Sequence, residues 1–343
     1  VVPDAMVPVV ERLAQNLFIC ASTISQHAAL ACFEPATLAI LEERREEFRR
    51  RRDYLLPALR ERGVRLILDF VPNHVAPDHP WVGEHPEYFV HGSADEAARE
   101  PASFVAAGGK FFACGRDPYF PAWPDVLQLN AFQPGLRQAV IDTVADIAAQ
   151  CDGVRCDMAM LMLNSIFERT WGARAGTKPD EDYWKAIIPA IKLGHPEFRF
   201  IAEAYWDLEW ELQQQGFDYC YDKKLYDRLE YSNAESVRLH LLANDAYQQK
   251  MLRFIENHDE PRAAKAFPEA KGRAAAVAMM TLPGGKLLFM GAELGQWHEW
   301  NFASQLDWYL LENKENQQTQ RFFKDINRFY LSQSPLWDID FSW

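Results

Sequence analysis

The sequence predicts an α/β fold in which parallel strands, joined by helices, form a barrel. Short apolar segments alternate along the chain with segments whose apolar residues recur at the period of a helix, the pattern of repeated βα units. Several of the short segments end in charged residues, and the carboxyl ends of the strands carry the chemistry in such barrels. A length of 343 residues and a hydrophobic content of 48% allow one large domain with a sizeable core.

The clearest strand covers Val64–Phe70, and the rest of the chain is interpreted around it. Its residues are apolar apart from one arginine and Asp69, as expected of a strand buried on both faces. A proline follows the strand and removes a backbone donor, which ends regular pairing. Asp69, Asn73 and His74 are therefore predicted at the carboxyl end of this strand.

Residues 1–62 are predicted to be mostly helical. The apolar period predicts a helix over Pro3–Asn16, whereas Asn16–Thr23 fits either a strand or a helix. A long helix is predicted over Pro35–Leu59, because a proline in the first turn removes no hydrogen bond. Gly63 is expected to end this helix before the strand begins.

Residues 75–129 form a long excursion between predicted strands. Many prolines and glycines in this stretch predict loops and short elements. Connections of this length are usually functional. We expect a small inserted subdomain whose aromatic residues mostly pack its own core.

The remaining helices and strands follow from the period of the apolar residues. Helices are predicted over Pro134–Gln150, Met160–Trp171, Tyr183–Leu193, Leu208–Gln215, Ser236–Ala243, Lys271–Met280 and Gln317–Leu331. Strands are predicted over Gly153–Cys156, Phe198–Ala202, Phe217–Tyr219, Met251–Ile255 and Lys286–Met290. An eight-stranded barrel needs two more strands from residues 1–62, where the pattern offers at most one. The barrel is therefore expected to be incomplete or irregular at its first two strands.

Composition narrows the classes of partner and compartment. The net charge of −13 disfavours nucleic acid and anionic membranes. The six cysteines are scattered and none has the spacing of a zinc site, so we expect a reducing compartment, the cytoplasm. We expect neither a secretory leader nor a membrane-spanning segment. No cofactor and no metal ligands are assigned, and a calcium requirement stays open.

The polar residues at four strand ends are expected to meet on one face of the barrel. They are Asp69, Asn73, His74, Arg155, Asp157, Glu203, Asn257, His258 and Asp259. Cleavage of a glycosidic bond needs one protonated carboxyl for the leaving group and one ionised carboxylate that attacks or activates water. Neighbouring carboxylates push each other's pKa values apart, which allows both roles at one pH. Any one of these residues alone would fit a structural role, so the interpretation depends on the four segments together.

These four segments, in this order, resemble the conserved regions of the α-amylase superfamily, glycoside hydrolase family 13, over about residues 63–291. The resemblance implies a (β/α)8 TIM barrel in which residues 75–129 are an inserted domain B. It also implies a retaining mechanism through a covalent glycosyl-enzyme.

The resemblance also implies a role for each polar residue. Asp157 matches the nucleophile, Glu203 the general acid/base and Asp259 the third carboxylate, which grips sugar hydroxyls. The residues that match sugar-binding or supporting positions are His74, His258, Arg155 and Asp69.

The last part of the chain, residues 284–343, resembles glycogen branching enzymes of the same superfamily. Leu287–Asn301 carries most of this likeness. Trp297 and Trp300 follow the last predicted strand, and two indoles among polar residues make a good sugar platform. We expect both at the rim of a glucan cleft, the alternative being that they pack the closing loop.

Residues 1–62 resemble instead a fragment of a fold-type I, pyridoxal-phosphate-dependent aminotransferase, on the segments Val1–Met6 and Asn16–Thr23. The cofactor-lysine motif of that family is absent, so its chemistry is not expected here. The chain thus looks like a composite of three parts, residues 1–62, 63–291 and 292–343.

Three functions are consistent with these patterns. The first is a retaining hydrolase that acts on the α-glucosidic bonds of an α-glucan or maltooligosaccharide. The second is a branching-type transglycosylase, which hands the same covalent intermediate to a sugar hydroxyl. The third is a composite chain without activity. The preferred bond, the chain length of the substrate and the oligomeric state stay open.

Overall fold

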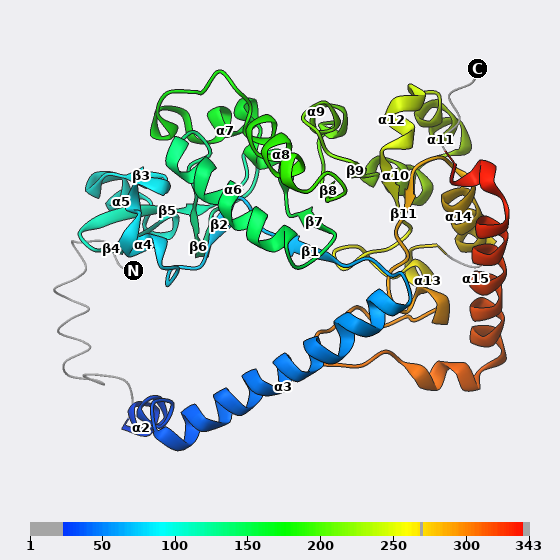
Figure 1. Ribbon diagram of the computed structural model, residues 1–343, viewed down its shortest axis with the longest axis horizontal. Helices are drawn as coiled ribbons and strands as arrows, with labels where there is room; N and C mark the ends of the chain where they lie inside the picture. Colours follow the sequence, from blue (N-terminus) through cyan, green and yellow to red (C-terminus); the bar gives the residue numbers. More distant parts are fainter. Residues whose placement is uncertain (1–22, 268–269, 339–343) are drawn as a thin grey trace.

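A six-stranded parallel sheet forms the centre of the protein, whose computed structural model describes residues 23–267 and 270–338 (Figure 1). In spatial order the strands are β1 (Ile67–Phe70), β7 (Gly153–Cys156), β8 (Arg199–Ala202), β9 (Tyr219–Tyr221), β10 (Met251–Arg253) and β11 (Gly285–Lys286). Every neighbouring pair is parallel. The order in space repeats the order along the chain, as consecutive βα units require, and the predicted parallel α/β architecture is confirmed.

Helices fill most of the connections between the strands. They are α2 (Thr23–Ala31), α3 (Pro35–Glu61), α6 (Pro134–Ala148), α7 (Asn164–Trp171), α8 (Tyr183–Gly194), α9 (Glu209–Gln214), α10 (Lys223–Tyr231), α11 (Ala234–Leu241), α12 (Asp245–Gln249), α13 (Ala263–Ala266), α14 (Ala270–Thr281) and α15 (Lys314–Ser332). Short 3₁₀ helices are η2 (Pro86–Tyr88), η3 (Pro101–Ser103), η4 (Ala159–Met162), η5 (Gly172–Ala175), η6 (Ala292–Leu294), η7 (Trp308–Glu312) and η8 (Ser334–Leu336). The predicted helix Pro3–Asn16 lies outside the described residues, as does Asn16–Thr23 apart from Thr23.

The sequence did not predict α10, and it placed one strand two residues too early. In α10 only Leu225 and Tyr226 are buried, so the charged residues around them hide the apolar period. The predicted strand Phe217–Tyr219 corresponds to β9, which covers Tyr219–Tyr221.

Both edges of the main sheet are open in the described part of the chain, where β1 and β11 each have a single neighbouring strand. Leu68 on β1 is 38% exposed, and the side chain of Asp69 is 59% exposed. The prediction that this strand is buried on both faces is therefore wrong, because no strand of the described chain lies beyond it. The strand predicted over Lys286–Met290 is also shorter, since pairing in β11 ends at Lys286.

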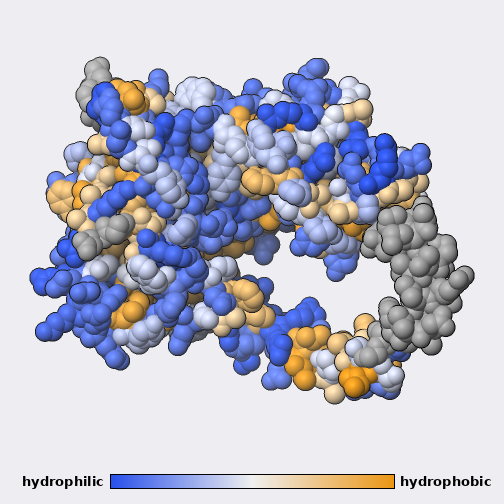
Figure 2. Space-filling view, turned by 180° about the vertical axis from the view of Figure 1, so that it is seen from behind, coloured by the Kyte–Doolittle hydropathy of each residue, from blue (hydrophilic) through white to orange (hydrophobic). Residues whose placement is uncertain are grey.

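Helix α3 extends away from the body of the molecule. It begins with Pro35 in its first turn, as predicted, and none of its residues is buried. Its apolar residues Leu41, Phe48 and Leu55 are 47%, 68% and 52% exposed. Figure 1 shows α3 as a long arm joined to the sheet at its carboxyl end, and Figure 2 shows hydrophobic surface around α2 at the far end of that arm.

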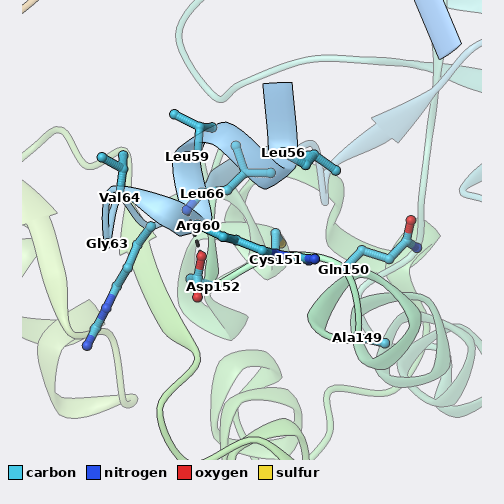
Figure 3. A pocket seen from close by; sticks show the side chains of 11 residues that line it. Leu56, Leu59, Arg60, Gly63, Val64, Leu66, Ala149, Gln150, Cys151 and Asp152 are labelled. Atoms are coloured by element: carbon cyan, nitrogen blue, oxygen red, sulfur yellow. Dashed lines mark hydrogen bonds between the residues drawn. The ribbon is translucent and has the colours of Figure 1, made fainter. Parts of the chain in front are cut away.

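The junction between α3 and β1 is fixed by a reciprocal contact with the turn before β7. The backbone N–H of Leu66 donates to the Asp152 carboxylate at 2.7 Å, and the Asp152 N–H donates to the Leu66 carbonyl at 2.8 Å. Figure 3 shows the pocket that the end of α3 and this turn line together. Because Leu66 and Asp152 precede their strands, this pocket lies at the amino ends of the strands, away from the carboxyl ends where the predicted site residues lie.

Residues 74–128 form a second, antiparallel sheet. The strands are β2 (His74–Val75), β3 (His91–Gly92), β4 (Phe104–Ala107), β5 (Lys110–Gly115) and β6 (Trp123–Gln128). The same stretch contains the short helices α4 (Trp81–Glu84) and α5 (Ala94–Arg99). The strand order is β2-β6-β5-β3, with β4 paired to β5. Phe89 and Phe112 are buried against each other at a centroid distance of 5.2 Å, whereas Tyr119 and Phe120 are 57% and 66% exposed. The pairing of β2 with β6 positions this sheet directly after β1.

Two hydrophobic clusters support the two halves of the main sheet. The larger joins Phe112 of the antiparallel sheet to Val154 on β7, Ile187 on α8 and Phe200 on β8. The smaller is formed between β9, β10, α14 and α15. The antiparallel sheet thus shares a core with the strands β7 and β8, which fixes its position beside their carboxyl ends. No helix in residues 23–267 or 270–338 combines the length and the apolar character needed to cross a membrane.

Candidate active site

Arg155 lies at the centre of the candidate site, on β7, and is 8% exposed. Its Nη1 donates to Asp69 Oδ1 at 3.0 Å and to Asp157 Oδ1 at 2.7 Å. Its Nη2 lies 2.9 Å from Glu203 Oε2. Burial opposes the charge of the guanidinium, but these carboxylates, Glu203 foremost, raise the pKa of Arg155 above its ordinary value. One cation therefore joins carboxylates from the carboxyl ends of β1, β7 and β8.

Glu203 is the buried carboxyl of the group. It follows β8 directly and is 3% exposed. The Tyr205 hydroxyl donates to its Oε1 at 2.6 Å, and the Met158 N–H donates to its Oε2 at 2.7 Å. Burial raises the pKa of Glu203 above its ordinary value, although Arg155 and these two hydrogen bonds oppose the rise. This carboxyl thus holds a proton more readily than a free glutamic acid does.

The contact from Met158 depends on an uncommon backbone conformation. Met158 has φ 44° and ψ 44°, the left-handed region that side chains other than glycine rarely adopt. It follows Asp157 directly, so the chain turns sharply at the end of β7 and aims an N–H at Glu203. Strained residues of this kind cluster at functional sites.

His74 approaches the site from the antiparallel sheet. It begins β2, and its ring meets Trp123 edge-on at a centroid distance of 5.4 Å. Burial lowers the pKa of His74, while Asp157 and Asp125 oppose this. A neutral imidazole near Asp157 suits a hydrogen bond to a sugar hydroxyl. Asn73, by contrast, is buried and accepts a bond from Gln128 at 2.9 Å, so it holds the two sheets together.

His258 and Asp259 form a separate pair after β10. His258 Nε2 lies 3.1 Å from Asp259 Oδ2, and their side chains are 36% and 49% exposed. The Asn257 side chain accepts the Asp259 N–H at 2.8 Å and so shapes the turn that carries both. No hydrogen bond or ion pair in the described chain joins this pair to Arg155. Both parts of the site act on Tyr205, whose pKa is raised by burial, by Glu203 and, to a smaller extent, by Asp259.

Two tyrosines belong to the site and were not predicted from the sequence. Tyr205 is the hydrogen-bond donor to Glu203 described above. Tyr221 ends β9, and the Arg155 guanidinium lies 5.6 Å from the centroid of its ring. Tyr221 was missed because the predicted strand ended at Tyr219, two residues early. The signal for Tyr205 was its position two residues after Glu203, where a side chain of extended backbone points the same way.

Trp297 and Trp300 lie in the segment after β11 and are 58% and 43% exposed. Arg262, which follows β10, donates to the His298 carbonyl at 3.0 Å and to the Met290 carbonyl at 2.7 Å. This segment is therefore tied to the loop that carries His258 and Asp259. The exposure of both indoles agrees with a cleft rim, and their role in binding stays a prediction.

The group around Arg155 places two carboxyl groups of unequal burial on one guanidinium, an arrangement that can supply an acid and an ionised carboxylate together. A buried carboxyl with a raised pKa lies within reach of the same guanidinium as a second carboxylate, and neutral imidazole and phenol groups surround them. Among the described residues, no three His, Cys, Asp or Glu side chains are grouped so as to hold a metal ion.

Comparisons with known proteins agree with the superfamily predicted from the four strand-end segments. The chain is 53% identical over 64 residues to the 1,4-alpha-glucan branching enzyme GlgB of Protochlamydia amoebophila, which is 19% of this chain and 9% of that protein. It is 31% identical over 220 residues to GlgB of Pseudomonas fluorescens, which is 55% of this chain and 30% of that protein. The chain thus spans less than a third of these relatives, and no family model matches it.

The fold resembles solved structures of glucan-acting enzymes. The cyclic alpha-maltosyl-(1→6)-maltose hydrolase of Arthrobacter globiformis, solved with maltose, superposes with a TM-score of 0.57 at 19% identity. The match covers 80% of this chain and 61% of that one. These comparisons support a branching-enzyme-like segment and an α-amylase-type fold. The resemblance of residues 1–62 to an aminotransferase, and the composite origin of the chain, receive no support from them.

Proposed function

We propose that this protein cleaves α-glucosidic bonds of α-glucans by a retaining mechanism. The observation that carries the proposal is that Arg155 binds Asp157 and Glu203 at the same time, at the carboxyl ends of the adjacent parallel strands β7 and β8. The likeness to branching enzymes in sequence and to a maltose-binding hydrolase in fold supports α-glucans as the substrate class.

In this proposal the two carboxyl groups have different roles because their surroundings differ. Asp157 accepts a 2.7 Å bond from Arg155 and is the nucleophile that attacks the anomeric carbon. Glu203 is buried, and its raised pKa suits the acid that protonates the leaving oxygen. In the second half of the reaction Glu203 takes a proton from the incoming water, and the bond to Asp157 breaks.

The other predicted residues bind the sugar or support the reacting groups. His74 reaches the cleavage point from the antiparallel sheet, and the His258–Asp259 pair approaches from the loop after β10. Asp69 orients Arg155 from β1. Trp297 and Trp300 offer flat apolar faces along the path of a longer glucan. The proposed units are residues 63–291 for the catalytic part, with residues 75–129 inserted, and residues 292–343 for the closing segment.

Transfer of the glycosyl group to a sugar hydroxyl is the second candidate function. The sequence similarity to 1,4-alpha-glucan branching enzymes favours it. Hydrolysis creates new reducing ends, whereas branching creates new α-1,6 linkages without them. The two candidates are therefore separated by a reducing-end assay and linkage analysis on the same reaction.

The proposal is tested by replacing Asp157 and by looking for a covalent adduct on this residue. The Asp157→Asn variant should lose at least about a thousandfold in kcat on maltoheptaose with a melting temperature close to wild type. Mass spectrometry of quenched wild-type reactions should detect a glycosyl adduct on Asp157. The matched control is Asp146→Asn on the exposed face of α6, which should retain full activity.

Activity above a tenth of wild type in Asp157→Asn would refute the nucleophile assignment. Absence of both cleavage and transfer in the folded wild-type chain would favour the third function, a chain without activity. A separation of about 5–5.5 Å between the carboxyl oxygens of Asp157 and Glu203 in a ligand-bound crystal would agree with retention, and a separation above about 6.5 Å would contradict it.

A further inference from the structure

A hollow outside the candidate active site combines aromatic faces with a buried carboxyl group. It is lined by residues of α9, α10, α11 and α12, and its volume is about 600 Å³, within the range of small-molecule sites. Its walls include Glu209, Trp210, Lys224, His240 and Tyr247. None of these residues belongs to the group around Arg155.

The aromatic wall is rigid on one side and open on the other. Trp210 is 46% exposed, although it follows a buried residue on the same helix. Its ring lies 6.4 Å from that of Tyr247, at an interplanar angle of 48°. The His240 ring meets the Tyr247 ring edge-on at a centroid distance of 6.2 Å, and its Nε2 lies 2.9 Å from Asp222 Oδ1. Tyr247 thus contacts both rings, and the indole of Trp210 keeps part of its surface exposed to solvent.

Glu209 is a buried acidic residue in the wall of the hollow. It is 3% exposed, and no side chain of the described residues donates a hydrogen bond to its carboxyl group. Burial raises the pKa of Glu209 to about 7, although a hydrogen bond from its own backbone N–H and the charge of Lys224 lower it. Asp207 and Asp222 raise this pKa further. A carboxyl group in the wall of a hollow can accept or donate hydrogen bonds, so its place beside Trp210 suits a ligand with hydroxyl groups.

The charges around the hollow favour a neutral ligand over an ion. Lys224 is already paired with Asp207, so its ammonium is not free for an anion. The described residues hold no cluster of three metal-ligating side chains, so a metal ion has too few ligands. Flat apolar faces beside a carboxyl group that accepts or donates hydrogen bonds match the two kinds of surface on a sugar ring.

We propose that this hollow is a second glucan-binding site, in which a sugar ring packs on Trp210 and its hydroxyls bond to Glu209. The choice of a glucan as the sugar follows from the proposed function. The site lies on the helices outside the sheet, so it holds a glucan chain without exposing it to Asp157. A polysaccharide bound there would stay attached to the protein while another part of it is cleaved.

The experiment is a titration of the Asp157→Asn full chain with maltoheptaose, followed by calorimetry and tryptophan fluorescence. Two classes of site are expected. In Trp210→Ala on the same background one class should weaken at least tenfold, and in Glu209→Gln, which conserves shape, it should weaken about three- to tenfold. The matched control is Trp337→Ala, which removes an indole of similar exposure, 50%, from another part of the chain and should retain both classes.

Equal isotherms for the parent and Trp210→Ala, with both proteins folded by circular dichroism, would overturn the proposal. If Trp210→Ala fails to fold, Glu209→Gln and a crystal soaked in maltoheptaose decide, and an empty hollow in the soaked crystal counts against the site. Turnover by the wild type is measured separately. Turnover without a Trp210-dependent class refutes the second site alone, and such a class without turnover refutes the proposed function alone.

Discussion

Arg155 connects more of the candidate site than any carboxylate does, because its two terminal nitrogens contact residues from three strands. Asp69, Asp157 and Glu203 lie within 3.0 Å of it. A planar guanidinium makes such divergent contacts, whereas an ammonium is a point charge on a flexible stem. The identity of this residue, and not only its charge, should therefore matter.

Arg155→Lys is expected to lower kcat on maltoheptaose at least about a hundredfold, because a lysine cannot hold Asp157 and Glu203 in one geometry. Steady-state kinetics and the melting temperature measure the effect. The control is Arg174→Lys, since Arg174 binds Glu96 through two nitrogens at 3.1 and 2.5 Å in a different part of the chain. If Arg155→Lys keeps more than a tenth of the activity, the proposed geometric role is wrong.

The Tyr205→Phe variant tests whether Glu203 acts as the proton donor, through the pH dependence of the reaction. The Tyr205 hydroxyl lowers the pKa of Glu203, so its removal should raise that pKa further above the ordinary value. Because the acid must be protonated, kcat/KM falls as pH rises through this pKa. The fall is therefore expected at higher pH in Tyr205→Phe than in wild type.

The measurement is a pH profile of kcat/KM for both proteins. Tyr309→Phe, which removes a hydroxyl from a residue that is 58% exposed, is the control and should leave the profile unchanged. A shift of the alkaline limb to lower pH in Tyr205→Phe would contradict the role of Glu203 as the acid.

At the scale of elements, the sequence predicted the positions of the strands better than it predicted how deeply each strand is buried. β7 has the predicted bounds, Gly153–Cys156, because a short segment of small and apolar residues, interrupted only by Arg155, fits a buried strand between turn signals. β1 has the same kind of pattern but is half-exposed, and exposure depends on neighbours that the pattern of one segment cannot reveal. The meeting of Arg155, Asp157 and Glu203 was predictable from parallel topology, whereas the partner of Glu203, Tyr205, depends on the loop conformation.

Helix α3 offers a test of how little an exposed apolar residue contributes to the free energy of unfolding. Phe48→Ala on α3 should change the free energy of unfolding by less than about 0.5 kcal/mol, because the phenylalanine is 68% exposed. Ile187→Ala on α8, which is fully buried, should cost about 2–5 kcal/mol. Urea denaturation of both variants provides the comparison. A loss above about 2 kcal/mol in Phe48→Ala would mean that another surface covers α3 in solution.

The segment after β11 provides a test of the two exposed indoles. Trp300→Ala should weaken the affinity for maltoheptaose about three- to tenfold and lower the melting temperature by less than a few degrees, as expected of a platform at a cleft rim. Trp184→Ala is the contrasting control, since this buried indole should mainly affect stability. A drop of several degrees with unchanged affinity in Trp300→Ala would favour packing of the closing loop.

At the scale of the whole molecule, the least conventional feature of residues 23–267 and 270–338 is that both edges of their parallel sheet are open. An unpaired edge presents free backbone donors and acceptors, which is a common cause of self-association. The net charge of −13 opposes this at neutral pH by mutual repulsion. Association is therefore expected to increase as the pH approaches the isoelectric point near 5.2.

The exposure of Asp69 on β1, which is an edge strand in the described part of the chain, also makes the site sensitive to ionic strength. The three carboxylates around Arg155 range from 59% exposed for Asp69 through 27% for Asp157 to 4% for Glu203. Dissolved ions screen exposed charges within a Debye length of about 8 Å at physiological salt and screen buried pairs much less. Added salt should therefore loosen the contact to Asp69 first and leave the contact to Glu203 almost unchanged. The guanidinium would then shift toward the two carboxylates proposed to carry the reaction.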